Sequence, residues 1–256
     1  MIDIDKLSFN QMMGEEIELI PLVSEEDEKK FSKQAVPEAL AILPLKNTVL
    51  FPGVVIPITA GRNKSIKLLE DAYRDKQLIG VVAQLNSKID EPEIKDINQV
   101  GTVARILKML KMPDGNTTVI LQGVRRFRWQ EMIQTEPYFM ASILTLEEKR
   151  PSARNKEFTA TIESIKDLAL QIIDINPAMP SEASMAINNI ESPSFLINFI
   201  SSNMNLTIAE KQRLLEYSNM NERAIEVLKL MDVELQKLEL KHNIQSKVRQ
   251  DMDQQQ

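Results

Sequence analysis

The sequence predicts an α+β protein. A mostly antiparallel β-domain with one inserted helix, shaped as a small closed or half-closed barrel, precedes an α-helical bundle that ends in one long helix. Short apolar runs separated by turn signals fill residues 40–148, and helix-capping signals divide residues 149–220. Residues 221–256 contain neither glycine nor proline, so they predict a single helix. Residues 1–39 form a separate acidic leader.

The acidic leader carries seven carboxylates between Glu15 and Glu28 and shows no sustained apolar periodicity. This composition is typical of a flexible, solvated segment, and an interaction tail is the alternative. The N-terminus lacks the pattern of a signal or transit peptide, and no stretch approaches the length of a membrane span. From these absences we expect no membrane partner. The chain also has no cysteine, which is consistent with the reducing cytoplasm as its location.

Apolar runs bounded by turn signals predict the strands of the β-domain. Pro52 and Pro57 restrict the second run to a sheet edge or a bulge, because proline cannot donate a ladder hydrogen bond. After Gly61, apolar residues at helical spacing predict the inserted helix. Asp114-Gly115 between two runs predicts a β-hairpin. The runs cover residues 39–45, 54–59, 78–85, 100–112, 116–122, 124–131 and 138–146.

Capping signals predict where the helices of the bundle begin. Ser192-Pro193 combines an N-cap with proline at the first helical position, and Thr207 with Glu210 forms a capping box. The long helix carries an apolar stripe that thins after Leu240. We expect its first half to join the bundle and its second half to project as an arm toward further polypeptide. The stripe residues, which are candidates for assembly contacts, are Leu228, Met231, Leu235 and Leu238.

No catalytic, cofactor or metal site is predicted for this chain. The 7 glycines form neither a G-x-x-x-x-G-K-[ST] phosphate loop nor a G-x-G-x-x-G turn. His242 is the single histidine, which excludes the usual histidine zinc sites, and we expect it to be a surface side chain. A serine–lysine pair is compatible with the composition, but no spacing indicates one.

Basic and aromatic residues alternate in one stretch, which suggests a nucleic-acid partner as an alternative. In a strand, alternation places Arg126 and Arg128 on one face and the three residues Arg125, Phe127 and Trp129 on the other. A core on one side and solvent on the other explain this pattern without a ligand. The net charge of −6 also opposes nucleic-acid binding.

The hairpin tip and one loop carry the candidate contacts for a polypeptide partner. Alternation places Met109 on the opposite face of its strand from Leu110 and Met112, so we expect an exposed apolar side chain near the turn. Exposed methionines suit adaptable contacts with unfolded, apolar segments. Phe51 and Pro52 in their loop are candidates as well. Core packing is the alternative for each of these residues.

Three stretches of the sequence resemble the N-terminal region of bacterial Lon proteases. They are Leu43-Pro-Leu-Lys-Asn-Thr-Val-Leu-Phe-Pro-Gly53 with its continuation to Ile66, Val100-Gly-Thr-Val-Ala104 with Leu107-Lys-Met-Leu-Lys-Met-Pro-Asp-Gly115, and Ala209-Glu-Lys-Gln212 with Leu214-Leu-Glu216 and Asn221-Glu-Arg223. They follow one another in the family's order. The acidic leader is longer than the family usually shows.

The resemblance implies a PUA-like β-domain, a helical bundle and a long helix that joins an ATPase module. It implies a cytoplasmic, hexameric, ATP-dependent serine protease that degrades misfolded and regulatory proteins, with the ATP, Mg and serine–lysine chemistry beyond residue 256. This chain would be the non-catalytic part that recognises unfolded or degron-bearing proteins and supports assembly with other Lon subunits. The alternatives are a PUA-like module that binds nucleic acid and a purely structural oligomerisation spacer.

Overall fold

The computed structural model describes residues 24–152, 154–176 and 182–253, so the predictions for residues 1–23 lie outside the described part. Its first element, α2 (Glu25–Lys33), begins with a capping box between Ser24 and Asp27. Phe31 of this helix packs against two of the hydrophobic clusters. The expectation of a flexible, solvated segment is therefore wrong for residues 24–33 of the leader.

Six strands form one mixed sheet, in the spatial order β2-β5-β4-β3-β1-β6. The strands are β1 (Ala39–Leu45), β2 (Val55–Ala60), β3 (Ile79–Ala83), β4 (Val100–Lys111), β5 (Thr117–Gln134) and β6 (Met140–Thr145). The inserted helix is α3 (Asn63–Arg74), and a short 3₁₀ turn, η1 (Ile94–Asp96), precedes β4. The pair β1–β3 is parallel and the other pairs are antiparallel, which confirms the predicted α+β class.

The long strand β5 lets the sheet pair back on itself. Its first half pairs with β2, and its second half pairs with β6, which also pairs with the start of β1. The pairings therefore run in a ring through β5, β4, β3, β1 and β6, with β2 outside the ring. Gly123 lies where β5 passes the loop after β1, and a Cβ there would lie 2.2 Å from the Phe51 carbonyl oxygen. Only glycine permits this close approach.

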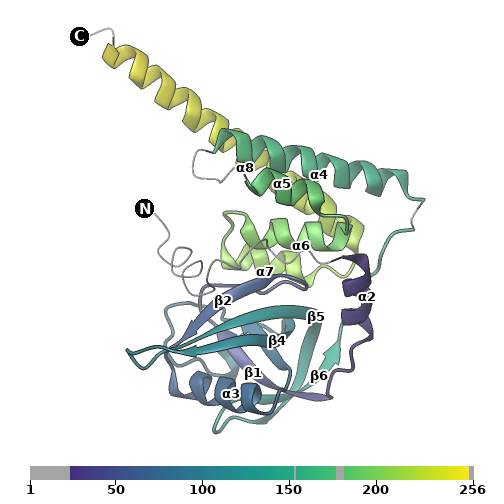
Figure 1. The fold of residues 1–256 in the computed structure, drawn as a ribbon, viewed down its shortest axis with the longest axis vertical. Coiled ribbons are helices and arrows are strands. Elements are labelled where there is room, and N and C mark those ends of the chain that lie inside the picture. The colour runs from purple at the N-terminus through teal and green to yellow at the C-terminus, as the bar shows by residue number, and fades with distance from the viewer. Residues whose placement is uncertain (1–23, 153, 177–181, 254–256) are drawn as a thin grey trace.

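The helices that follow the sheet in the described part of the chain cover one end of it (Figure 1). The predicted caps at Ser192 and Thr207 are confirmed, because each side chain accepts a hydrogen bond from a backbone N–H in the first turn. Asn155, which the sequence analysis did not name, caps the first of these helices in the same way. Among the described residues these helices are α4 (Lys156–Ile175), α5 (Glu182–Asn189), α6 (Pro193–Asn203), α7 (Ile208–Glu216) and α8 (Met220–Asp253).

The sheet and the helices share one hydrophobic core. The predicted border between residues 148 and 149 falls between β6 and α4. One cluster nevertheless contains Phe51 and Val100 from the β-domain together with Phe195 and Leu214 from the bundle. Phe51 is fully buried there. The prediction that Phe51 contacts a partner is therefore wrong for this structure, and core packing describes it instead.

The long helix α8 has a buried half and a projecting half. Met231 and Leu235 are buried where the helix packs along α4, so they are not available for the predicted assembly contacts. Leu228 packs on the same core, half-buried, and Leu238 is also half-buried. Beyond them the helix extends past the other elements as a single rod (Figure 1). Its exposed apolar side chains there are Leu240, Ile244 and Val248.

Truncating Phe51 tests its place in the shared core. We expect Phe51→Ala to lower the free energy of unfolding by about 3 kcal/mol, because it removes a large side chain from a packed site. Met112→Ala, which removes an exposed side chain, should change it by less than about 0.5 kcal/mol. Urea unfolding measures both, and equal stability of the two variants would contradict the assignment of Phe51 to the core.

Candidate polypeptide-binding surface

The outer face of the β4–β5 hairpin exposes several apolar side chains. Leu110 pairs with Thr118, and the Thr118 hydroxyl lies 3.1 Å from that of Thr59 on β2, so these three residues share one face. Met109 lies on the opposite face and packs with the cluster that α3 covers. The alternation predicted for Met109 and Leu110 is therefore confirmed.

A β-bulge adds Leu107 to this outer face. The pairing of β4 with β5 shifts between Ile106 and Lys108, which leaves Leu107 unpaired and 45% exposed. Bulges re-aim side chains in this way. Met112 beside the turn is 38% exposed, and Leu110 is half-buried. We call the surface formed by Pro57, Leu107, Leu110 and Met112 the hairpin face.

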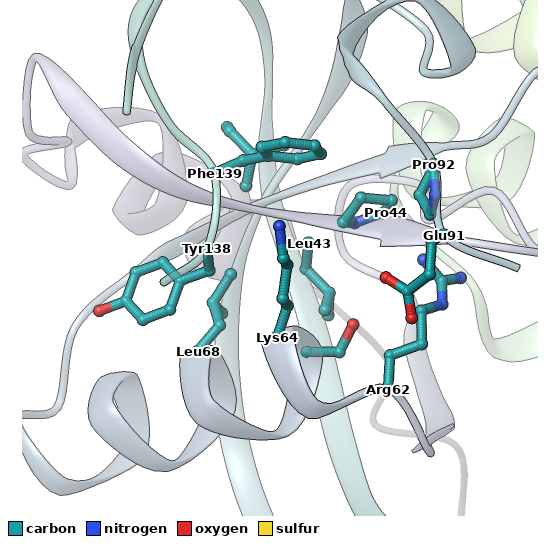
Figure 2. A pocket seen from close by; sticks show the side chains of 11 residues that line it. Leu43, Pro44, Arg62, Lys64, Leu68, Glu91, Pro92, Tyr138 and Phe139 are labelled. Atoms are coloured by element: carbon teal, nitrogen blue, oxygen red, sulfur yellow. The ribbon is translucent and has the colours of Figure 1, made fainter. Parts of the chain in front are cut away.

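A groove begins at the hairpin face and runs along β2. Its volume is about 590 Å³, and its lining includes Pro57, Thr59 and Met112 on one side and Pro44 and Lys46 on the other. This size lies within the range of about 300–1,000 Å³ that is common for ligand sites. A smaller hollow continues it along β1 to Tyr138 and Phe139, beneath which α3 supplies Lys64 and Leu68 (Figure 2).

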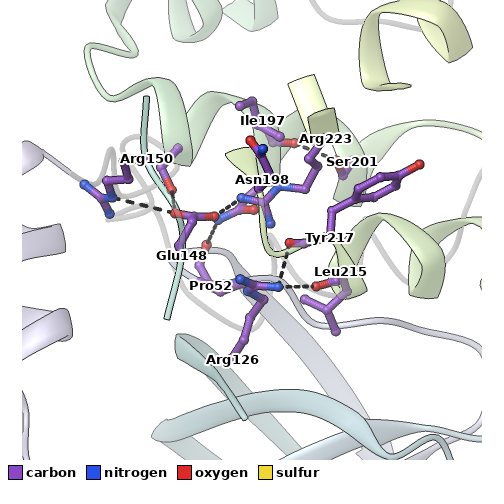
Figure 3. Close-up of polar contacts among 12 residues, drawn as sticks. Pro52, Arg126, Glu148, Arg150, Ile197, Asn198, Ser201, Leu215, Tyr217 and Arg223 are labelled. Carbon is purple, nitrogen blue, oxygen red and sulfur yellow. Dashed lines mark hydrogen bonds and ion pairs between the residues drawn. The ribbon is translucent and has the colours of Figure 1, made fainter. Parts of the chain in front are cut away.

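Arg126 fixes the position of the hairpin sheet relative to the bundle. Its side chain leaves β5 and donates to the carbonyl oxygens of Leu215 at 2.9 Å and Tyr217 at 2.7 Å, where α7 ends (Figure 3). A third hydrogen bond reaches the Glu147 carbonyl at 3.3 Å. Burial, together with the nearby Arg223 charge, lowers the pKa of Arg126 to about 10, so the group remains charged at neutral pH.

Glu148 connects the base of α8 to the end of the β-domain. Its carboxylate forms an ion pair with Arg223, a fully buried residue in the first turn of α8, and accepts from the Ser194 hydroxyl at 3.1 Å (Figure 3). Burial lowers the pKa of Arg223, and the Glu148 charge opposes that shift. We call Arg126, Glu148 and Arg223 the clamp.

Pro52 belongs to the same interface rather than to the free surface. Its carbonyl oxygen accepts from the Asn198 side chain of α6 at 3.0 Å, and its ring is half-buried. A second bond of this kind runs from the Gln212 side chain to the Val100 carbonyl at 3.0 Å. Pro52 still lines a cavity between α2 and the bundle, but it does not join the hairpin face.

Comparison with known proteins places this architecture in a family. Residues 39–233 match the family model described as the ATP-dependent protease La (LON) substrate-binding domain. The chain belongs to this Lon family. The match confirms the resemblance seen in the sequence and covers both the β-domain and the bundle.

Several Lon proteases are similar to the whole chain. The Lon protease of Flavobacterium johnsoniae is 58% identical over 256 residues, which are 100% of this chain and 31% of that protein. The Lon protease of Cytophaga hutchinsonii is 49% identical over 242 residues, 94% of this chain and 30% of that protein. The chain therefore spans about a third of the length of these relatives.

Two solved structures share the fold. The N-terminal domain of Mycobacterium avium complex Lon protease has a TM-score of 0.63 at 21% identity, over 76% of this chain and 98% of that one. The Lon N-terminal domain protein from Xanthomonas campestris has a TM-score of 0.54 at 17% identity, over 75% and 97%. Both likenesses support the α+β arrangement of the Lon chain described above.

The arginine-rich stretch of this Lon chain is largely accounted for by packing. Arg126 is 3% exposed and inside the clamp, so the prediction that it faces solvent beside Arg128 is wrong. Phe127 is buried, and the Trp129 ring donates to the Asn98 carbonyl at 3.0 Å. Arg128 remains exposed. The face that the nucleic-acid alternative needs is thus covered by the bundle at its centre.

Two further expectations from the sequence concern metal sites and membrane spans. No three carboxylate or histidine side chains there gather as a possible metal site, and no helix there is long and apolar enough to cross a membrane. His242 is exposed on α8, as expected. The predictions that the chain carries no catalytic group, cofactor or metal stay predictions.

Removing the clamp carboxylate tests the electrostatics of the interface. We expect Glu148→Ala to lower the free energy of unfolding by about 3 kcal/mol, because Arg223 would remain buried without its counter-charge. Glu147→Ala is the matched control, since its side chain is exposed and its carbonyl contact with Arg126 is retained. Urea unfolding of both variants gives the comparison. A loss of less than about 1 kcal/mol for Glu148→Ala would contradict the role assigned to the pair.

Proposed function

We propose that this chain is the substrate-capturing region of a Lon-type ATP-dependent protease. Membership of the Lon substrate-binding domain family supports a role in substrate interaction. The hairpin face is the surface that fits this role best, because Leu107 and Met112 expose apolar side chains on it and Met112 also lines an open groove. Unfolded and degron-bearing proteins expose apolar segments of the kind such a surface binds.

The proposal assigns catalysis to polypeptide outside this chain. The relatives are about three times as long as the chain, which leaves room for an ATPase module that uses ATP and Mg and for a serine–lysine protease module. A cytoplasmic location and a hexameric ring follow from the same proposal. Six weak hairpin faces around one ring would raise the effective concentration of a captured substrate without tight individual contacts.

Contacts between subunits are a second role that one observation favours. Leu240, Ile244 and Val248 recur at every fourth residue on the projecting half of α8, and each is more than 50% exposed. This spacing places them along one side of the helix. They replace Met231 and Leu235 as the candidates for assembly, because those two side chains are enclosed by the bundle.

Binding of an unfolded protein tests the hairpin face. We expect the chain to bind reduced, carboxymethylated lactalbumin weakly, with a dissociation constant in the micromolar range. The double change Leu107→Ser/Met112→Ser should weaken binding roughly tenfold, because two partly exposed apolar contacts are lost. Fluorescence titration measures both constants.

The matched control is Ile133→Ser. Ile133 is 58% exposed near the other end of β5, away from the hairpin tip, so this change should leave the dissociation constant within twofold of the original. No binding at high micromolar concentration would contradict the proposal. Equal weakening by the control would show that general surface hydrophobicity, rather than the hairpin face, accounts for capture.

A further inference from the structure

Two strand edges stay open at the groove beside the hairpin face. β2 pairs with β5 on one side, and β1 pairs with β6 only over Ala39–Ala41. Among residues 24–152, no strand pairs with the outer side of β2 or with the outer side of β1 beyond Ile42. Open edges of this kind can accept an extended peptide as an additional strand.

Hydrogen bonds at the ends of these strands show which residues direct their backbone N–H and C=O groups into the groove. The Ile42 N–H donates outward to the Phe139 carbonyl at 2.8 Å, whereas the Leu45 carbonyl accepts from Gln84 next to β3 at 2.8 Å. Backbone groups alternate in direction along a strand. After Ile42, the next residue of β1 whose backbone groups point away from β3 and toward the groove is therefore Pro44.

The same argument orients β2. The Val54 carbonyl accepts from the Gly123 N–H of β5 at 2.9 Å, so Val55, Pro57 and Thr59 direct their backbone groups away from β5. Proline at 57 fits this position because its missing N–H would have faced the gap. The open edge of β2 thus offers three carbonyl oxygens but only two N–H donors, those of Val55 and Thr59.

The groove between the edges has the size and continuity that an extended segment needs. The groove and the smaller hollow of Figure 2 share Leu43, Pro44, Arg62, Ser65 and Glu91, so one channel follows the outer edge of β1. At its other end the channel reaches Pro57 and Met112, which belong to the hairpin face. A chain held by the hairpin face can therefore continue into the channel.

The charges along the channel favour a basic segment. Asp90, Glu91 and Asp114 line it together with the three cations Lys46, Arg62 and Lys64. Lys46 forms an ion pair with Asp90, and Lys64 forms one with Glu136 outside the lining, whereas Arg62 donates to the Gln84 side chain. Two carboxylates, Glu91 and Asp114, are then left against the one cation Arg62 in this lining, and the excess negative charge attracts lysine or arginine side chains.

We propose that the channel binds an extended, basic segment of a protein substrate as an added strand along β2. This inference rests on the proposed function and specifies the binding mode. Main-chain hydrogen bonds would supply affinity without sequence selectivity, as a region that receives many substrates needs. A second copy of β2 is a poor occupant, because antiparallel pairing centred on Pro57 would set two residues without N–H groups against each other.

The test uses the whole chain and a fluorescein-labelled hexapeptide of alternating valine and lysine. Thr59→Pro removes a donor from the open edge, and Thr59→Ala is the matched control that keeps the backbone N–H. Both changes remove the hydroxyl contact between Thr59 and Thr118, and neither removes a backbone hydrogen bond between β2 and β5. We expect Thr59→Pro to weaken peptide binding at least fivefold relative to Thr59→Ala, measured by fluorescence polarisation.

A second measurement leaves the protein unchanged. Strand addition predicts that N-methylation of one alternate set of peptide N–H groups weakens binding at least fivefold, while N-methylation of the other set does not. The proposal would be overturned if Thr59→Pro and Thr59→Ala bound the peptide equally and the two differently N-methylated peptides also bound equally. If Leu107→Ser/Met112→Ser still weakened capture of unfolded protein, the proposed function would stand and only the strand mode would fall.

Other occupants of the channel give distinct results. Peptide binding that appears only after deletion of residues 1–23 would identify the leader as the occupant and overturn the proposal. Self-association that Thr59→Pro abolishes and Thr59→Ala retains, seen by sedimentation velocity, would identify a second copy and overturn it as well. Binding that is unchanged by the deletion, and monomeric behaviour of both variants, support a substrate segment.

Discussion

The structure depends on one hydrophobic cluster that the sheet and the bundle build together, and on the Arg126 guanidinium, which links the same two parts. Arg126 leaves the middle of β5 and holds the carbonyl oxygens at the end of α7. Phe51 and Val100 enter the same core from the sheet side. Because α8 begins a few residues after α7, this contact also sets the direction in which α8 leaves the body. The same contact thus connects the sheet that carries the hairpin face with the helices that carry the arm.

The clamp holds the sheet against the bundle with charged side chains whose burial costs solvation free energy. The buried guanidinium groups of Arg126 and Arg223 lie near the carboxylate of Glu148, and the charges of Glu28 and Arg150 also act on Arg223. Nε and Nη1 of Arg223 have no hydrogen-bond partner among the described residues. Buried ion pairs often contribute little net stability compared with apolar packing. Their geometry is directional, however, which suits a contact that sets the angle between the sheet and the long helix α8.

Local signals in the sequence predicted the elements well, because caps, turns and apolar periods act within a few residues. The hairpin at Asp114-Gly115 and the caps at Ser192 and Thr207 are examples. Contacts between distant segments could not be read in this way. The outward position of Leu107 arises from a bulge, and the inward position of Arg126 requires the carbonyl groups of α7 nearly 90 residues later. Phe51 looked like a loop residue because its core partners lie mainly in the helices.

The most direct test of the shared core compares two probes of unfolding in urea. Trp129, the single tryptophan, reports on the sheet by fluorescence, and circular dichroism at 222 nm reports mainly on the helices. One cooperative unit predicts coincident transitions with the same midpoint and slope. Two separated transitions, with the tryptophan signal changing while the helical signal persists, would contradict the account.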